Sequence, residues 1–100
     1  MKSDLINKIK ILKKELQKEG FIIDAIFGSF VKGENFNDID LLYHLDKPFF
    51  EKYNGFVGFK KLEEIKEIIK QELNYEVDLA PIDNLSKTAK KYIFKDIIYV

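Results

Sequence analysis

Two stretches of the chain repeat hydrophobic residues at the spacing of an amphipathic helix. The first predicts a helix over residues 4–19, with Ser3 as its N-terminal cap and Gly20 as the left-handed residue that ends it. The second predicts a helix over residues 59–73, with Lys and Glu on its other side. The two apolar stripes consist of Leu5, Ile9, Leu12 and Leu16 in the first helix and Leu62, Ile65, Ile69 and Leu73 in the second.

Three shorter segments have the character of β-strands. Residues 21–27 are an apolar run that ends at Gly28, as expected of a buried strand that leads into a turn and a short helix. Residues 38–45 begin with acidic and aliphatic side chains in alternation, which predicts a strand with two different faces. Residues 75–80 predict a third strand, stopped by Pro81.

The remaining segments are less regular. Residues 46–58 contain proline and glycine among several aromatic residues, and this pattern predicts an irregular loop. Residues 85–95 predict a last helix, and residues 97–100 an extended end. The order α-β-(α)-β-α-β-α predicts an α/β or α+β fold, with residues 1–100 forming a single domain.

The composition is that of a folded protein, with 46% hydrophobic and 34% charged residues. Its 17 Lys balance 17 acidic residues and it contains no Arg, so the charge pattern of a nucleic-acid-binding surface is missing. The lack of Cys excludes disulfides and thiol catalysis and fits a reducing cytosol. No apolar run approaches the roughly 20 residues of a membrane span, and residues 1–10 do not resemble a signal peptide. We therefore expect a cytoplasmic protein.

Three acidic residues lie in predicted strands. Asp38 and Asp40 are two positions apart, so they project from one face while Ile39 faces the core. Adjacent carboxylates are tolerated when a cation lies between them, and their oxygens suit Mg²⁺ or Mn²⁺. Asp78 has a similar setting in the third strand, and strand pairing could bring it against the other two. Three carboxylates can hold two metal ions, and such a pair can activate the attacking oxygen and neutralise the leaving pyrophosphate in an in-line displacement at phosphorus.

A phosphate-binding segment is expected where the first strand ends. Gly28 and Ser29 offer backbone N–H groups and a hydroxyl to phosphate oxygens. Lys32, one helical turn further on, adds a positive charge for the same triphosphate, although a solvated lysine is the simpler interpretation. Gly33 gives conformational freedom to the loop that leads to Asp38.

Together these residues resemble the signature of the minimal nucleotidyltransferases (MNT proteins) of the DNA polymerase beta-like superfamily. That signature is Gly-Ser, a spacer and Asp-x-Asp, followed late in the chain by a third carboxylate. The matching segments are Gly28-Ser29, Asp38-Ile39-Asp40-Leu41, Glu76-Val77-Asp78-Leu79 and the ending at residues 92–100. The spacer between Ser29 and Asp38 has eight residues where the family usually has ten, and Lys32 and Asn37 replace the usual Arg and Ser.

The resemblance implies a nucleotidyltransferase fold, in which helices pack on a small mixed β-sheet. It implies a metal-dependent enzyme with Mg²⁺, or alternatively Mn²⁺, as cofactor and ATP as substrate. The implied catalytic metal ligands are Asp38, Asp40 and Asp78, and the implied nucleotide-binding residues are Gly28, Ser29 and Lys32. Because members of the family commonly act as antitoxins that transfer AMP to a tyrosine of an HEPN-domain ribonuclease toxin, the resemblance also implies an HEPN partner.

Two other functions stay open at this point. The chain could be a binding module that neutralises its toxin by contact alone, or it could transfer a nucleotide to a small-molecule alcohol. A chain of 100 residues has no room for an acceptor-binding domain, which favours an acceptor surface supplied by a protein partner in a hetero-oligomer. Direct binding of nucleic acid is disfavoured by the neutral charge and the lack of Arg.

Several other polar and aromatic residues have simpler interpretations. Asp83 is expected to cap the last helix. His44 has no evident partner and is expected to be a polar residue near a strand end. Asp24 would either support the site from behind or face water. The aromatic residues of segment 49–59 are expected to cover the core, with a nucleobase contact and a partner surface as alternatives. These residues are Phe49, Phe50, Tyr53, Phe56 and Phe59.

Overall fold

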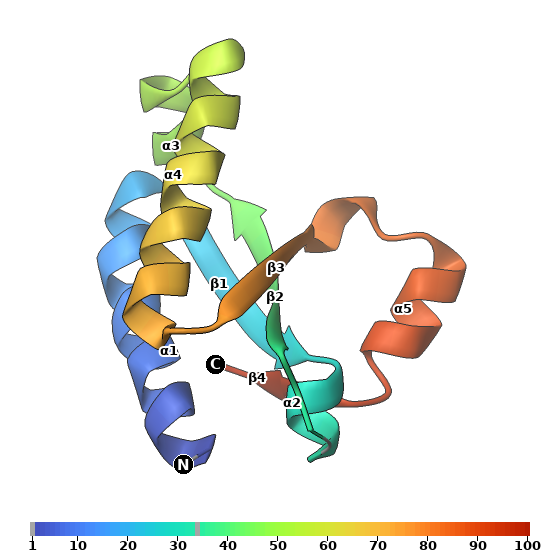
Figure 1. Cartoon of the computed structure of the whole chain (residues 1–100). Helices are drawn as coiled ribbons and strands as arrows, with labels where there is room; N and C mark the ends of the chain where they lie inside the picture. The colour runs from blue at the N-terminus through green and yellow to red at the C-terminus, as the bar shows by residue number, and fades with distance from the viewer. Residues whose placement is uncertain (1, 34) are drawn as a thin grey trace.

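The computed structural model describes residues 2–33 and 35–100. The strands are β1 (Phe21–Phe27), β2 (Asp38–Leu45), β3 (Glu76–Pro81) and β4 (Ile97–Tyr99). The helices are α1 (Lys2–Leu16), α2 (Ser29–Lys32), α3 (Lys47–Lys52), α4 (Phe56–Leu73) and α5 (Lys87–Ile93), with 3-10 turns η1 (Gln17–Glu19) and η2 (Ile82–Asn84). Figure 1 shows α1 and α4 together on one face of the sheet and α5 to one side. Within the described residues, no helix combines the length and apolarity needed to cross a bilayer.

The four strands form one mixed sheet in the order β3-β2-β1-β4. β1 pairs with β2 and with β4 in antiparallel fashion, whereas β2 and β3 are parallel. A parallel pair needs a long crossover, and α3 and α4 provide it. The α+β layered fold expected from the sequence is therefore confirmed.

The core lies between the sheet and the pair α1 and α4. Alternate residues of β2 divide its two faces, so that Ile39 and Leu41 are fully buried while Asp38 and Asp40 project from the other side. The apolar stripes of the two helices cover the same core, as predicted. Their buried members are Ile9, Leu12 and Leu16 of α1 and Ile65, Ile69 and Leu73 of α4.

The prediction of an irregular loop over residues 46–58 was wrong. Asp46 caps α3 by accepting a hydrogen bond from the backbone N–H of Lys47 at 2.9 Å, and Pro48 lies in the first turn of that helix. Gly55, with a φ of 58°, precedes the first residue of α4. Proline and glycine therefore mark helix ends here, where both residues are favoured, and not an irregular segment.

Smaller differences concern the helix caps. Because α1 begins at Lys2, Ser3 lies inside the helix and is not its cap. Asp83 belongs to η2, and α5 is capped by Ser86, whose hydroxyl accepts a hydrogen bond from the backbone N–H of Ala89 at 3.1 Å. Gly20 ends η1 in the left-handed conformation that the sequence predicts.

Candidate active site

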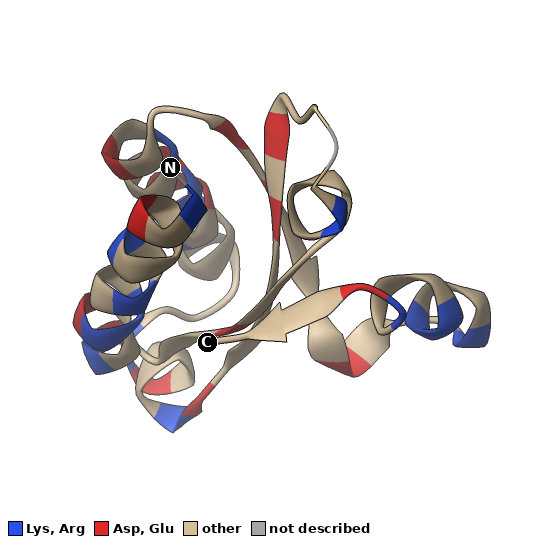
Figure 2. Ribbon diagram, turned by 90° about the horizontal axis from the view of Figure 1, so that it is seen from below, with Lys and Arg blue, Asp and Glu red and all other residues tan. Residues whose placement is uncertain are grey.

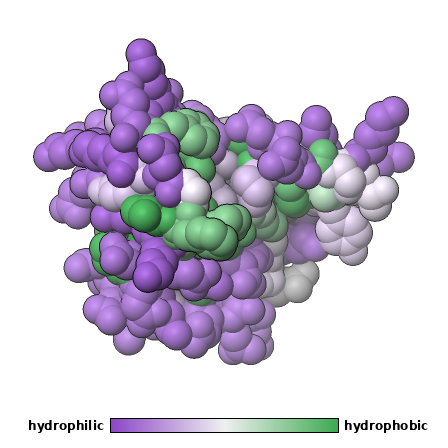
Figure 3. Space-filling view, turned by 90° about the horizontal axis from the view of Figure 1, so that it is seen from above, coloured by the Kyte–Doolittle hydropathy of each residue, from purple (hydrophilic) through white to green (hydrophobic). Residues whose placement is uncertain are grey.

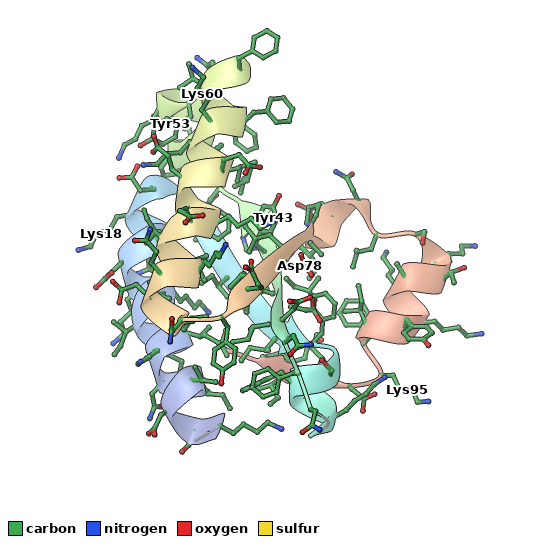
Figure 4. The ribbon with its side chains drawn as sticks, in the orientation of Figure 1. Lys18, Tyr43, Tyr53, Lys60, Asp78 and Lys95 are labelled. Atoms are coloured by element: carbon green, nitrogen blue, oxygen red, sulfur yellow. The ribbon has the colours of Figure 1, made fainter. Side chains whose placement is uncertain are left out.

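The register of β2 and β3 brings the predicted carboxylates to one face of the sheet. Asp40 lies directly opposite Asp78, and Asp38 lies opposite Glu76. Side chains opposite one another on neighbouring strands project the same way from strands about 4.8 Å apart. Figure 4 shows Asp78 between the sheet and α5, on the side away from α1 and α4. Asp38, Asp40 and Asp78 therefore share the face that the helical layer leaves open.

Asp40 is the electrostatic centre of this group. Partial burial raises the pKa of its carboxyl from 3.8 to about 6, and the negative charges of Asp78 and Asp38 contribute to the rise. At neutral pH the ionised Asp40 is therefore held against two like charges. A cation at this position would relieve the repulsion.

Gly28 places the phosphate-binding segment beside these carboxylates. Phe27, the last residue of β1, pairs with Asp40, and Gly28 follows it with a φ of 81°. A Cβ atom on Gly28 would lie 2.3 Å from Oδ2 of Asp40. Both the backbone conformation and the close approach require glycine. The Gly28–Ser29 segment and the start of β2, which are separate in the sequence, thus meet at the end of β1.

Ser29 begins the short helix α2, which is held in place by Phe30. The Phe30 ring is 1% exposed and packs edge-on against Phe36, with ring centroids 4.9 Å apart. Lys32, at the other end of α2, lies with its Nζ 5.6 Å from the ring centroid of Tyr92. Lys32 thus reaches toward the C-terminal part of the chain, and its contact with a triphosphate stays a prediction.

Residues 5–100 match the family model described as the nucleotidyltransferase domain. The chain belongs to this family. This nucleotidyltransferase is 32% identical over 89 residues to the protein adenylyltransferase MntA of Thermococcus cleftensis. The aligned region covers 88% of this chain and 84% of the relative. The resemblance noted in the sequence is confirmed, and so is the assignment as an enzyme.

Solved structures confirm the nucleotidyltransferase fold. A structure described as that of a candidate minimal nucleotidyltransferase superposes with a TM-score of 0.70 at 17% identity, over 99% of this chain and 95% of the other. A chain of the complex between the tri-AMPylated HEPN toxin of Shewanella oneidensis and an MNT antitoxin superposes with a TM-score of 0.65 at 17% identity. That superposition covers 99% of this chain and 71% of the other.

The carboxylates of this nucleotidyltransferase fit a hard divalent cation by their chemistry. Among residues 2–33 and 35–100, no three acidic or histidine side chains converge as a complete metal site. Mg²⁺ does not need one, because it commonly binds one or two carboxylates and completes its shell with water and substrate phosphates. Asp40 and Asp78 are register partners on neighbouring strands, and the negative charges of Asp78 and Asp38 contribute to the raised pKa of Asp40.

A second polar pair lies on the same face of β2. Nδ1 of His44 is 2.8 Å and 2.9 Å from the two carboxylate oxygens of Asp24. The expectation that His44 lacks a partner was therefore wrong, and Asp24 faces this histidine. The β1–β2 register places Ile22, two positions before Asp24, opposite His44. His44 is four positions beyond Asp40, roughly 13 Å along the strand, too far to act on the same atoms.

Proposed function

We propose that this nucleotidyltransferase is an antitoxin that transfers AMP from ATP to a tyrosine of a cognate HEPN ribonuclease toxin. The observation that carries the proposal is the pairing of Asp40 with Asp78 beside Gly28. The acceptor class is supported by the relatives, one an adenylyltransferase and the other a complex with an AMPylated HEPN toxin. In this proposal the partner supplies the acceptor surface and the two proteins form a hetero-oligomer, as the complex of an MNT antitoxin with its HEPN toxin supports.

Each predicted residue has a role in this reaction. Asp38, Asp40 and Asp78 would hold Mg²⁺, for which Mn²⁺ is a chemically similar substitute. When bound, the metal would supply positive charge that stabilises the phosphate oxygens and activates the attacking hydroxyl. Gly28 and Ser29 hold the triphosphate against the carboxylates.

The chemical step is a displacement at the α-phosphorus of ATP. The tyrosine oxygen forms a bond to phosphorus, the bond from phosphorus to the bridging oxygen breaks, and pyrophosphate leaves with the electron pair. The hydroxyl proton passes to the Asp78 carboxylate, which also orients the attacking oxygen. Lys32 adds positive charge near the departing phosphates.

A surface far from the carboxylates favours neutralisation by contact as a second function. Four apolar side chains at the α3–α4 turn are strongly exposed, and we call this group the aromatic end. Its members are Phe50, Phe56, Val57 and Phe59. Figure 3 shows hydrophobic side chains gathered on the face seen from this end of the molecule. Exposed apolar patches of this kind are typical of protein interaction sites.

Transfer of radioactive label from α-labelled ATP distinguishes the two functions. The protein is co-expressed and co-purified with a candidate HEPN partner and assayed with Mg²⁺ as wild type and as Asp38→Ala/Asp40→Ala. Glu63→Ala/Glu67→Ala is the matched control, because it removes two exposed carboxylates from α4 on the other face of the sheet. We expect label on a toxin tyrosine with wild type and control, and a loss of at least about 1000-fold with the double aspartate variant.

Two results would contradict the proposal. Equal labelling by Asp38→Ala/Asp40→Ala would exclude the carboxylate mechanism. Absence of label with wild type, while all three proteins still neutralise the toxin, would establish antitoxin action by contact. Thermal unfolding of each variant confirms that the domain remains folded.

A further inference from the structure

A pocket of about 350 Å³ lies between α2 and the C-terminal segment that contains α5. Its walls are formed by Lys32 of α2, by Thr88, Lys91 and Tyr92 of α5, and by Lys95. Figure 4 shows Lys95 on the turn after α5, on the side of α2. The volume is within the range of small-molecule sites, roughly 300 to 1000 Å³.

The pocket has a marked excess of positive charge. Residues 84–95 contain four Lys and no acidic residue. Within the described part of the chain, Lys32, Lys91 and Lys95 make no ion pair, whereas the lysines at positions 47, 52, 61 and 70 each do. Figure 2 shows the Lys segments of α5 at the end of the molecule away from α1 and α4. Three unpaired ammonium groups around one hollow favour a ligand with a phosphate.

Tyr92 gives the pocket a second recognition element. Its side chain is 75% exposed, and its ring forms part of the pocket wall. An exposed aromatic ring beside lysines is the combination used to stack a nucleobase while its phosphate is neutralised. A bare pyrophosphate would not need the ring. The hydroxyl of Thr88 adds a hydrogen-bonding group on the same wall.

The pocket is close to the carboxylates through α2. This helix spans Ser29–Lys32, about 6 Å at 1.5 Å per residue. Its first residue follows Gly28 beside Asp40, and its last residue lines the pocket. A ligand in the pocket would therefore lie next to the segment proposed to hold the triphosphate.

We propose that this pocket binds an adenylate unit, with its base on Tyr92 and its phosphate between Lys91 and Lys95. The base identity rests on the proposed function, in which AMP is the transferred group. Two molecules can supply this adenylate unit: the donor ATP, or the acceptor after an AMP has been joined to it. An acceptor carrying more than one AMP is known in the Shewanella toxin complex.

Direct binding of AMP tests the pocket without any reaction. AMP and ATP are titrated calorimetrically, in EDTA, into wild type, Lys91→Gln/Lys95→Gln and the control Lys60→Gln/Lys66→Gln on α4. We expect the dissociation constant for AMP to rise by about tenfold or more only in the first variant, because two charge-assisted contacts are lost. Unchanged AMP affinity in that variant would overturn the proposal.

Replacement of the ring separates stacking from charge. Tyr92→Phe keeps an aromatic surface and should bind AMP nearly as well as wild type, whereas Tyr92→Leu should bind it several-fold more weakly. Equal binding by both variants would remove the base from the proposed site. Because Tyr92 is mostly exposed, neither change should affect folding.

The number of AMP groups on the toxin, counted by intact mass, identifies the source. If the pocket holds donor ATP, Lys91→Gln/Lys95→Gln slows the first transfer. If it holds attached AMP, the first transfer keeps its rate and later additions are lost. A wild type that binds AMP in the pocket but transfers none contradicts the proposed function alone.

Discussion

The two ends of β2 carry opposite chemistry. At its start, Asp38 and Asp40 crowd against Asp78 in an open face of the sheet. Beyond its last residue, Leu45, the chain enters α3 and reaches the aromatic end, where Phe56 is 87% exposed. One strand thus connects a concentration of negative charge to a concentration of exposed apolar surface.

Both ends are unfavourable for the isolated chain, but for different physical reasons. Like charges near Asp40 repel each other and disfavour its ionised form. At the other end, Phe56 and Phe59 leave large apolar surfaces in water. A metal with a nucleotide would relieve the first cost, and a protein surface would relieve the second. Each end is therefore complete only with a ligand of its own kind.

The largest effect is expected where the aromatic end joins the core. Phe49 and Phe50 are neighbours in α3, but Phe49 is 2% exposed and Phe50 is 57% exposed. Phe49→Ala should lower the free energy of unfolding by about 3 to 5 kcal/mol, because it leaves a cavity in the core. Phe50→Ala should change it by less than about 0.5 kcal/mol. Urea unfolding of both variants measures the difference, and similar losses would mean that the exposed surface itself stabilises the fold.

The carboxylate group could be predicted from the sequence because it depends on local alternation. Asp38 and Asp40 alternate with buried residues, and the apolar run around Asp78 reads as a strand. Asp24 and His44 could not be paired in the same way. A register shift between Ile23 and Ala25 displaces β1 at Asp24, and no local pattern reveals such a bulge.

The structure of segment 46–58 was missed for another reason. Proline and glycine are compatible with both loops and helix ends, so the pattern around Pro48 and Gly55 does not distinguish them. The exposure of Phe56 and Phe59 was also hidden, because aromatic residues are usually assigned to a core. The exposed fractions of Phe49 and Phe50, 2% and 57%, show which ring is inside, and α3 packs so closely on Gly20 that a Cβ atom there would lie 2.3 Å from the backbone nitrogen of Phe49.

The next effect concerns the carboxylates at the start of β2, Asp38 and Asp40 with Asp78 of β3, which we call the acidic end. Gly28→Ala should lower nucleotidyl transfer by at least about 100-fold, since its Cβ would displace the Asp40 carboxylate and small misplacements of reacting groups cost this much. Gly33→Ala is the matched control, because Gly33 has nearly the same φ, 79°, but has nothing within 4 Å of a Cβ. Gly28→Ala also carries the larger backbone strain, because the ψ of Gly28 is −154° and that of Gly33 is 13°. Thermal unfolding therefore confirms that each variant is folded before the activities are compared. Equal activity in the two would show that the Asp40 position is not critical.

The smallest effect separates charge repulsion from packing at Asp40. Its pKa of about 6 lies above the ordinary value of 3.8, so the contribution of Asp40 to stability is fully present below pH 3.8 and is lost as pH rises through about 6. Asp40→Asn removes this loss, and in EDTA at pH 7.5 it should raise stability by about 1 kcal/mol after solvent screening, or roughly 4 to 8 °C in Tm. At pH 4 the two proteins should have the same Tm.

Asp83→Asn, which removes an exposed carboxylate from η2, is the control and should show no such gain in stability. If Asp40→Asn is no more stable than wild type at pH 7.5, charge repulsion at the acidic end does not destabilise the fold. Exposed apolar surface at the aromatic end would then be the one unfavourable feature of the pair.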